Sequence, residues 1–419
     1  MAAIAIIGSG ISGMGSAHLL HPHHAITLYE KNAVVGGHTR TRMVSYGDRE
    51  IAVDTGFIVF NKRNYPNLTP LFEQLGVPIQ KSDMTFAATI DNGALEWCAR
   101  DLNGVFGQRR NLLRPSFYRL MGQVARFNRE AAGAVAANPT IALGELISQL
   151  KLSQQFLNYY ILPMGGAIWS APPSKILGFP AATFIHFFEN HGLLATSGQP
   201  QWYTVAGGSQ EYVTRITAPF MDRIRTNCAA TRVTREAGEV QVSDTRGETL
   251  TYDHVIFASH ANETLAMLAD ATDAERSVLG AFTYQKNHAV LHRDVRVMPK
   301  RKRCWASWVY MANNAGSEAN ISVTYWMNLL QSIDNHYPLF VTLNPTFAIA
   351  PEHIFDEHDF EHPVFTSEAI AAQARIPELQ GQKNSWFAGA YHRYGFHEDG
   401  LLSAVNVANG LGVRAPWQS

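Results

Sequence analysis

The chain lacks several features that would assign it to a specialised class of protein. Its 419 residues include only three cysteines, and these form no CxxC pair, so the odd and widely spaced set argues against a disulfide framework. The formal net charge is −1, which gives no electrostatic case for binding nucleic acid. No apolar run reaches the roughly 18 residues of a membrane-spanning helix. We therefore expect a globular protein of a reducing compartment.

The N-terminus also lacks the basic segment that begins a signal peptide, and Gly8 interrupts its apolar run. We accordingly expect a cytoplasmic protein. One short basic run, Lys300 to Arg303, leaves contact with an anionic membrane surface open, although a solvated hairpin turn is the simpler interpretation. Three histidines at positions 21, 23 and 24 resemble a metal group, but their place between a helix and a strand favours a solvated turn, and no metal is predicted.

The most informative segment is the start of the chain, IAIIGSGISGMGSAHLL. A β-branched strand leads into Gly8, Gly10 and Gly13, and a helix is predicted from about Ile11. Gly8 permits the tight turn, Gly10 lets the backbone approach a pyrophosphate, and Gly13 lets the helix pack on the strand. The N–H groups of Ile11, Ser12 and their neighbours then point at the phosphates. This order of parts predicts a dinucleotide site.

An acidic residue follows the glycine turn at the sequence distance expected for a ligand of the adenosine ribose. Glu30 ends the second predicted strand, 22 residues after Gly8, with Lys31 next to it. A carboxylate there accepts hydrogen bonds from the adenosine ribose and repels a 2′-phosphate, so NADP is not expected.

A Gly-Gly pair follows in the segment VGGHTRT, with Gly36, Gly37, His38 and Thr39. This segment resembles the corresponding motif of the flavin-containing amine oxidase and phytoene desaturase superfamily. The resemblance implies FAD, with these four residues along the pyrophosphate and ribityl chain. The residue after the pair is usually Arg in that superfamily, whereas this chain has His38, so Arg40 or Arg42 is an alternative phosphate ligand.

The C-terminus carries a second part of the resemblance, in WFAGAYHRYGFHEDGLLSAVNVANGLG (386–412). A strand ends at Gly389, and a helix follows a loop that reaches Gly400. In the superfamily this helix points its N-terminus at the flavin, which implies that Gly400, Leu401 and Leu402 supply backbone donors. The resemblance also implies that Gly56 and Phe57 lie under the flavin and that the strand holding Val233 lies against the adenine.

The resemblance covers nearly all of the chain and is nearest to bacterial amine-oxidase-like proteins with predicted NAD/FAD binding. It implies an α/β fold, in which an FAD-binding Rossmann-like domain of the glutathione-reductase-like, amine oxidase type accompanies a mixed α+β substrate domain. We assign residues 1–80, 202–282 and 384–419 to the FAD-binding domain. Residues 81–201 and 283–383 form the substrate domain. The first interval is mostly helical, and the second is richer in strands, which are expected over 289–297, 304–311 and 321–330.

Three polar side chains are candidates for chemistry near the flavin. His397 takes the place of a cage aromatic in the superfamily's closing loop, with Phe396 as the alternative, and His392 lies on the same loop. Either histidine could accept a proton, or could merely hydrogen-bond the loop. Asn61 could reach the flavin or substrate, or could be a turn residue. Glu398 and Asp399 could be helix N-caps. The segment from Pro163 to Pro172 could line a tunnel or pack in the core.

The substrate is less explicit than the cofactor. Many amine oxidases place a lysine on a substrate-domain strand near the flavin, whereas Asn287 or His288 falls nearest that place here and Lys286 is one or two positions early. We therefore expect a desaturase or dehydrogenase that acts on a C–C bond of a fatty-acyl or other lipid substrate. The alternatives are an amine oxidase, a redox-neutral flavin-dependent isomerase, and a flavoprotein that serves only as a binding module. The expected partner is a hydrophobic small molecule.

Overall fold

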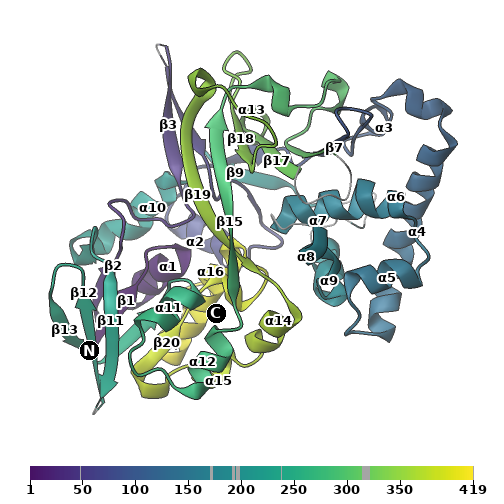
Figure 1. Cartoon of the computed structure of the whole chain (residues 1–419). Coiled ribbons are helices and arrows are strands. Elements are labelled where there is room, and N and C mark those ends of the chain that lie inside the picture. The colour runs from purple at the N-terminus through teal and green to yellow at the C-terminus, as the bar shows by residue number, and fades with distance from the viewer. Residues whose placement is uncertain are drawn as a thin grey trace.

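The computed structural model describes residues 1–47, 49–169, 173–190, 194, 199–236, 238–313 and 321–418. Figure 1 shows a lower body around β1, β2 and β20, an upper body around a larger sheet, and a group of helices beside the upper body. The long strands β15 (Thr283–His292) and β19 (Ile354–Val364) pair antiparallel and run from one body towards the other (Figure 1).

The lower body is built on a five-stranded sheet whose strands lie in the order β10-β2-β1-β14-β20. Every paired neighbour in it is parallel. These strands come from the beginning, middle and end of the chain: β1 (Ala3–Ile7), β2 (Ala25–Tyr29), β10 (Ile224–Arg225), β14 (His254–Phe257) and β20 (Ser385–Phe387). All of them fall within the three segments assigned to the FAD-binding domain, while the domain boundaries themselves stay a prediction.

Successive side chains of β1 point to opposite faces of the sheet and are apolar on both, so both faces must be covered. Ile4 and Ile6 face helices α1 (Ile11–Leu20) and α16 (His397–Gly410), whereas Ala5 and Ile7 face the opposite core cluster. A strand buried on both faces has this continuously apolar sequence. The opposite face is covered by an antiparallel sheet of β11 (Ala230–Glu236), β12 (Glu239–Asp244) and β13 (Thr249–Tyr252), and by the helices α11 (Ala261–Met267), α12 (Asp273–Leu279), α14 (Ser367–Gln373) and α15 (Ile376–Leu379).

The upper body contains a seven-stranded mixed sheet in the order β19-β15-β18-β17-β16-β7-β8. Only the β7–β16 pair is parallel. Its other strands are β7 (Phe86–Ile90), β8 (Leu95–Cys98), β16 (Trp308–Ala312), β17 (Ile321–Trp326) and β18 (Phe340–Leu343), and α13 (Met327–Leu330) follows β17.

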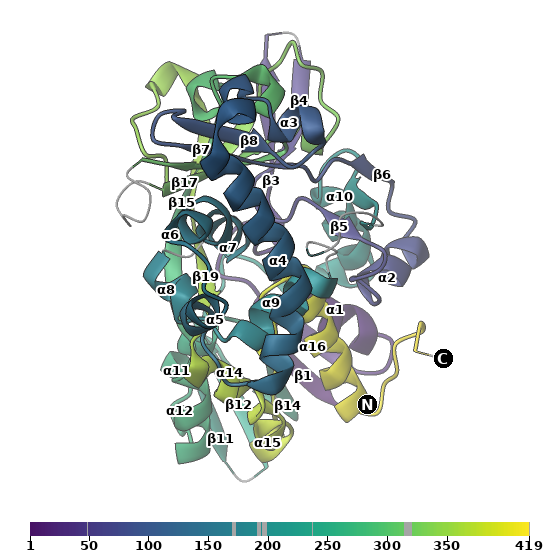
Figure 2. The same ribbon diagram turned by 90° about the vertical axis from the view of Figure 1, so that its right-hand side faces the viewer.

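Helices pack against this sheet in the largest core cluster of the molecule. The longest is α4, which Figure 2 shows running down the side of the molecule from the end that carries α3. The group comprises α3 (Leu102–Val105), α4 (Pro115–Ala137), α5 (Leu143–Gln149), α6 (Gln154–Phe156), α7 (Leu162–Trp169), α8 (Pro173–Leu177) and α9 (Ala181–Asn190).

Smaller elements join the two bodies. They are the antiparallel pair β3 (Thr41–Tyr46) and β4 (Arg49–Asp54), the sheet β5-β9-β6 (Phe60–Asn61, Trp202–Val205 and Ile79–Ser82), and the helices α2 (Leu68–Gln74) and α10 (Gln210–Thr217). In the described ranges no helix is long and apolar enough to cross a membrane.

The α/β architecture with a mixed α+β second body confirms the predicted fold class. The predicted strand over 289–297 was misplaced, because β15 begins at Thr283, ends at His292 and is followed by a 3-10 turn. The segment 304–311 likewise becomes a strand only at Trp308. Of the segment Pro163 to Pro172, residues 170–172 lie outside the described ranges.

Candidate functional site

The glycine turn after β1 leaves room for a ligand at one glycine only. A Cβ on Gly8 would lie 2.7 Å from the Ala258 carbonyl oxygen, and one on Gly13 would lie 1.8 Å from the Gly8 carbonyl oxygen, so both are closed against protein backbone. A Cβ on Gly10 would meet nothing within 4 Å. Gly10 is also the N-cap of α1, with no side-chain cap and no acidic residue in the first turn. The helix therefore presents its first N–H groups to an open cradle suited to an anion.

Ile11 and Ser12 support this cradle through their side chains. Both are buried, and a Cβ on Gly400 of α16 would come within 2.7 Å of Ile11 Cγ2 and 2.9 Å of Ser12 Oγ. Their side chains therefore pack against α16, while only their backbone can face a phosphate.

Glu30 lies at the end of β2 and is almost completely buried. Its Oε2 accepts hydrogen bonds from the Ser9 N–H at 3.2 Å and the Ser9 hydroxyl at 2.5 Å. The carboxylate is thus held against the glycine turn, as an adenosine-side residue must be. Lys31 next to it is exposed and forms a 2.7 Å ion pair with Glu263 of α11; its contact with a cofactor stays a prediction.

The backbone that lies beside Glu30 is not that of Val233. Val233 is fully buried in the core behind the sheet, and its carbonyl accepts the Ala269 N–H at 3.0 Å. The backbone that runs beside Glu30 belongs to Asn227 and Cys228, and the Cys228 N–H donates to the Glu30 carbonyl at 2.9 Å. Val233 lies further along the chain, in β11, and a contact of its strand with the adenine stays a prediction.

The Gly-Gly segment lies directly on the glycine turn. The Gly36 N–H donates to the Ser9 carbonyl at 3.2 Å, and a Cβ on Gly37 would come within 3.0 Å of Gly10 Cα. Both glycines have positive φ, +130° and +58°, which other residues adopt at a cost. The two glycine motifs, 26 residues apart in sequence, therefore form one continuous backbone surface.

His38 extends this surface with an imidazole whose Nε2 lacks a partner. Its Nε2 is buried and accepts or donates no hydrogen bond. Its ring lies 5.1 Å from that of Phe360, 5.4 Å from that of His362 and 6.1 Å from that of His260. Burial, followed by the neighbouring histidines, holds the pKa of His38 well below its ordinary value.

The two arginines that follow are paired with one carboxylate. Arg40 Nη1 lies 2.5 Å from Asp356 Oδ2, and Arg42 Nε lies 3.0 Å from the other oxygen of the same carboxylate. A contact of either arginine with a phosphate stays a prediction, and the orphaned nitrogen of His38 is a further candidate. The open cradle, the uncapped helix end and this nitrogen together fit a dinucleotide diphosphate.

Three residues predicted for the FAD site, His397, Phe57 and Thr39, lie together. A fourth residue, Tyr212, joins them and was not revealed by the sequence. His397 stacks on Phe57, with ring centroids 3.9 Å apart and planes at 11°. Its Nε2 lies 2.6 Å from the Tyr212 hydroxyl and 3.2 Å from Thr39 Oγ1. Burial lowers the pKa of His397 to about 3, so the ring is neutral at physiological pH. Tyr212 comes from α10; the helical pattern of GGSQEYVTRI indicated its helix but not where this side chain points.

The neighbouring Gly56 packs tightly on the Gly-Gly segment, because a Cβ at Gly56 would lie 2.0 Å from the His38 carbonyl oxygen. The Phe57 N–H donates to that carbonyl at 2.8 Å. This contact holds Phe57, and with it His397, beside the Gly-Gly segment.

The closing helix begins earlier than the sequence analysis placed it. Helix α16 begins at His397, so the Gly400 N–H already has an intrahelical acceptor, the Phe396 carbonyl at 3.1 Å. The prediction that Gly400 and Leu401 supply free donors was therefore wrong by one turn. The N–H groups without intrahelical acceptors are those of His397, Glu398 and Asp399. Gly400 instead allows α16 to pack closely on α1, and Leu401 is buried beside it.

The two carboxylates of this turn act as caps. Asp399 accepts the Phe396 N–H of its own helix at 2.9 Å, and Glu398 accepts the Leu68 N–H at the start of α2 at 3.0 Å. Burial raises the pKa of Glu398 to about 7 and that of Asp399 to about 6. Gly389 joins the strand before them to α16, because its N–H donates to Ser403 Oγ at 2.8 Å.

The other two catalytic candidates have different surroundings. Asn61 is fully buried, and its Oδ1 accepts the Asn64 N–H at 2.8 Å, which is the arrangement of a turn residue; its Nδ2 has no partner. The ring of His392 lies beside that of Tyr391, and its buried Nε2 has no partner. Catalytic roles for both stay predictions.

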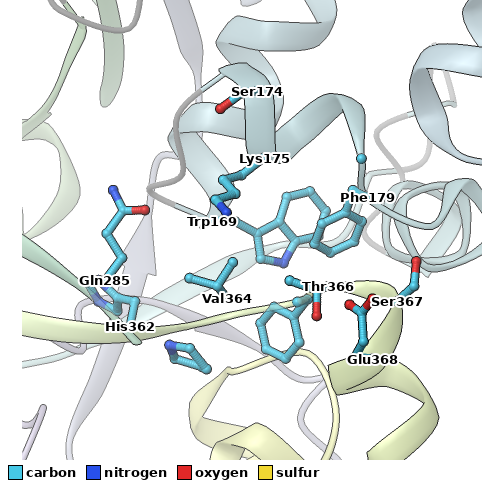
Figure 3. A pocket seen from close by; sticks show the side chains of 13 residues that line it. Trp169, Ser174, Lys175, Phe179, Gln285, His362, Val364, Thr366, Ser367 and Glu368 are labelled. Carbon is cyan, nitrogen blue, oxygen red and sulfur yellow. The ribbon is translucent and has the colours of Figure 1, made fainter. Parts of the chain in front are cut away.

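A cavity of about 230 Å³ opens between the helical layer and the β19–α14 segment (Figure 3). Trp169, Phe179 and Phe365 form apolar walls, Lys175 projects towards Trp169, and His362 lines the opposite side (Figure 3). Lys175 is exposed. The cavity therefore combines aromatic walls with a polar rim that carries both a cation, Lys175, and a carboxylate, Glu368.

Ring contacts connect the cavity to both parts of the predicted flavin site. The Trp169 ring lies 5.0 Å from that of Phe187, which stacks at 5.0 Å on Phe396, the residue before His397. On the other side, His362 is the neighbour of His38. The cavity thus adjoins the segments expected to hold the flavin.

The strand position discussed for amine oxidases carries no lysine. Asn287 is fully buried, donates to His362 Nδ1 at 2.9 Å and accepts from Asn344 Nδ2 at 2.8 Å. Lys286 lies opposite Glu361 in the β15–β19 register and is exposed.

Comparisons with known proteins agree with this geometry. The family model for flavin containing amine oxidoreductases matches residues 11–277. A fatty acid isomerase from P. acnes that produces CLA has a similar structure, with 17% identity, a TM-score of 0.69 and 98% of each chain covered. The cyclohexylamine oxidase of Brevibacterium oxydans IH-35A has 13% identity and a TM-score of 0.69, covering 98% of this chain and 99% of its own.

A reduced UDP-galactopyranose mutase has 13% identity and a TM-score of 0.68, covering 98% of this chain and 94% of its own. At these identities the similarity establishes the fold. The search of curated proteins gave no match.

Proposed function

Because the chain belongs to the family of flavin containing amine oxidoreductases, we propose that it is a desaturase or dehydrogenase acting on a C–C bond of a hydrophobic, acid-bearing lipid such as a fatty acid. FAD is its cofactor and oxidoreduction its reaction class. The observation that supports the substrate is the cavity of aromatic walls with Lys175 at its edge.

When bound, FAD accepts the hydride that the substrate loses. The protein's own part is to bind, orient and shield the substrate. Trp169, Phe179 and Phe365 exclude water from an acyl chain, while Lys175 is placed to pair with its carboxylate. His397, held by Tyr212 and stacked on Phe57, is a neutral group that can hydrogen-bond or take the proton lost from the neighbouring carbon.

The test is anaerobic mixing of the FAD-loaded enzyme with long-chain fatty acids and, separately, with primary amines. Loss of the flavin absorbance near roughly 450 nm, as for ordinary oxidised flavins, together with a newly unsaturated acid supports the proposal. Bleaching by amines alone would instead identify an amine oxidase. Double-bond migration without bleaching would identify an isomerase, and no response to either class would leave a binding module.

Lys175→Met tests the acid-binding part. We expect KM for a fatty acid to rise about tenfold with kcat little changed, because an ion pair at a partly exposed site affects binding more than chemistry. The methyl ester should show no such difference between wild type and variant. An equal KM for the acid in both proteins would remove Lys175 from substrate recognition.

A further inference from the structure

One end of the upper body combines exposed apolar side chains with many cations. We call this surface the tip patch; it is formed by residues 100–119 and 300–303. Leu102, Leu112, Leu113 and Tyr118 are 78%, 45%, 87% and 50% exposed. Exposed large apolar side chains that occur together mark interaction sites more often than those that occur singly. Figure 2 shows the patch elements α3 and the start of α4 at the end of the molecule away from the N-terminus.

Contacts between the two segments show that the patch is one surface. Arg100 Nη2 donates to the Trp305 carbonyl at 3.1 Å. A Cβ on Gly107 would come within 3.5 Å of Arg303 Cβ, and the Tyr118 hydroxyl donates to the Leu112 carbonyl at 3.0 Å. The basic run at 300–303 therefore lies beside the segment from Arg100 to Gly107, which holds Leu102 and leads into Leu112 and Leu113.

The charge of this surface differs from that of the whole chain. The tip patch and the residues next to it, 93–119 and 299–305 together, contain nine Lys or Arg and two acidic residues. This is a surplus of seven positive charges, although the complete chain has a net charge of −1. The basic residues are Arg100, Arg109, Arg110, Arg114, Arg119, Lys300, Arg301, Lys302 and Arg303.

The two acidic residues are already engaged within the protein. Glu96 is fully buried and accepts from Arg301 at 2.7 Å and from the Lys300 N–H at 2.8 Å. Asp101 caps α3 by accepting the Gly104 N–H at 2.6 Å. Helix α4 adds the positive end of its dipole, since Arg114 is its N-cap and its first turn has no acidic residue. Most of the positive charge therefore faces solvent.

We propose that the tip patch docks the protein onto an anionic phospholipid surface, with Leu112 and Leu113 entering the interface and the surrounding cations pairing with lipid phosphates. A basic surface alone would also suit nucleic acid, but nucleic acid offers no apolar layer for the two leucines, whereas a bilayer does. This inference does not depend on the proposed substrate.

The experiment is sedimentation of the FAD-loaded protein with vesicles of phosphatidylcholine alone or with roughly one third phosphatidylglycerol, the two compositions being chosen to separate charge from apolar contact. Wild type should bind the anionic vesicles at low salt and dissociate at high salt. Arg109→Gln/Arg110→Gln should weaken partitioning about 25-fold, since each cation contributes about fivefold near such a surface. Leu112→Ser/Leu113→Ser should also weaken it.

Matched controls come from exposed residues elsewhere. Arg63→Gln/Arg232→Gln removes the same charge, and Met43→Ser/Leu250→Ser removes exposed apolar side chains; both should bind within about twofold of wild type. Thermal unfolding of every variant checks that the fold is retained. The proposal is overturned if wild type does not sediment with anionic vesicles, or if the patch and control variants bind equally.

Discussion

The diphosphate cradle and the substrate cavity are built in opposite ways. At the cradle, Gly10 and Gly37 present backbone, and two segments near the start of the chain make almost the whole surface. At the cavity, Trp169, Lys175 and Phe365 supply side chains from segments far apart in sequence. The cradle is therefore sensitive to any added side chain, whereas the shape of the cavity depends on which side chains line it, and those of Trp169 and Phe365 also belong to the core.

Gly10→Val is expected to have the largest effect on the cradle. A side chain there would occupy the open space in front of α1 and prevent the diphosphate from approaching, so the purified protein should be colourless. Its far-UV circular dichroism should match that of wild-type apoprotein, because a Cβ at this position touches no protein atom. A yellow variant would show that the cofactor does not lie at this turn.

Gly13→Ala is the matched substitution for the fold. Its Cβ would overlap the Gly8 carbonyl, so we expect destabilisation by more than about 3 kcal/mol, measured by denaturant unfolding. Equal stability of the two variants would break the contrast between an open and a closed glycine.

His397→Ala tests the expected flavin end of the site, and we expect its effect to be of intermediate size. Flavin reduction by substrate should slow about a hundredfold while FAD remains bound, because the imidazole stacks on Phe57, which is expected to lie under the flavin, whereas the cradle is formed by backbone. Tyr212→Phe, which removes the hydrogen bonds of this hydroxyl to the His397 ring and to Thr39 but keeps the imidazole, should slow reduction less. Stopped-flow absorbance measures both, and an unchanged rate in His397→Ala would assign the residue to structure alone.

The smallest expected effect concerns Glu398, which joins α16 to the start of α2. Its pKa in the folded protein is raised to about 7, above the unfolded value, so folding takes up a proton. The stabilisation is therefore complete below about pH 4.5 and is lost as the pH rises through about 7. Glu398→Gln should flatten the pH dependence of the free energy of unfolding across this range by about 2 kcal/mol. An unchanged slope in urea titrations would assign the pH dependence to other groups.

The difference between the two regions also explains what the sequence could reveal. The cradle follows from residues close in sequence, and its glycines, Glu30 and the Gly-Gly pair are recognisable as a pattern. The start of α16 was misplaced although its sequence carried a signal, since Asp399 stands three residues after Phe396 as in a capping box. The resemblance implied that the strand of Val233 lies against the adenine, but the sequence did not show that the Val233 side chain is buried in the core or that Cys228 lies beside Glu30.

Other features depend on contacts that no local pattern contains. Arg40 and Arg42 are neutralised by Asp356, more than 300 residues away, and Tyr212 meets His397 across 185 residues. The cavity likewise depends on how α7, α8 and β19 approach one another. Such pairings follow from the complete packing and were inaccessible to analysis of one sequence.

The order of strands in the parallel sheet has a consequence for biosynthesis. Strand β1 lies between β2 and β14, and β20 completes the edge with residues near the end of the chain. A ribosome therefore releases the first strand long before β14 and β20 exist, and α16, which packs on α1, emerges after β20. The early strands must remain unaggregated until then, and the cofactor gains its full site only after α16 has left the exit tunnel. For this protein, a truncation that removes α16 should therefore damage the dinucleotide site as much as a mutation in the glycine turn does.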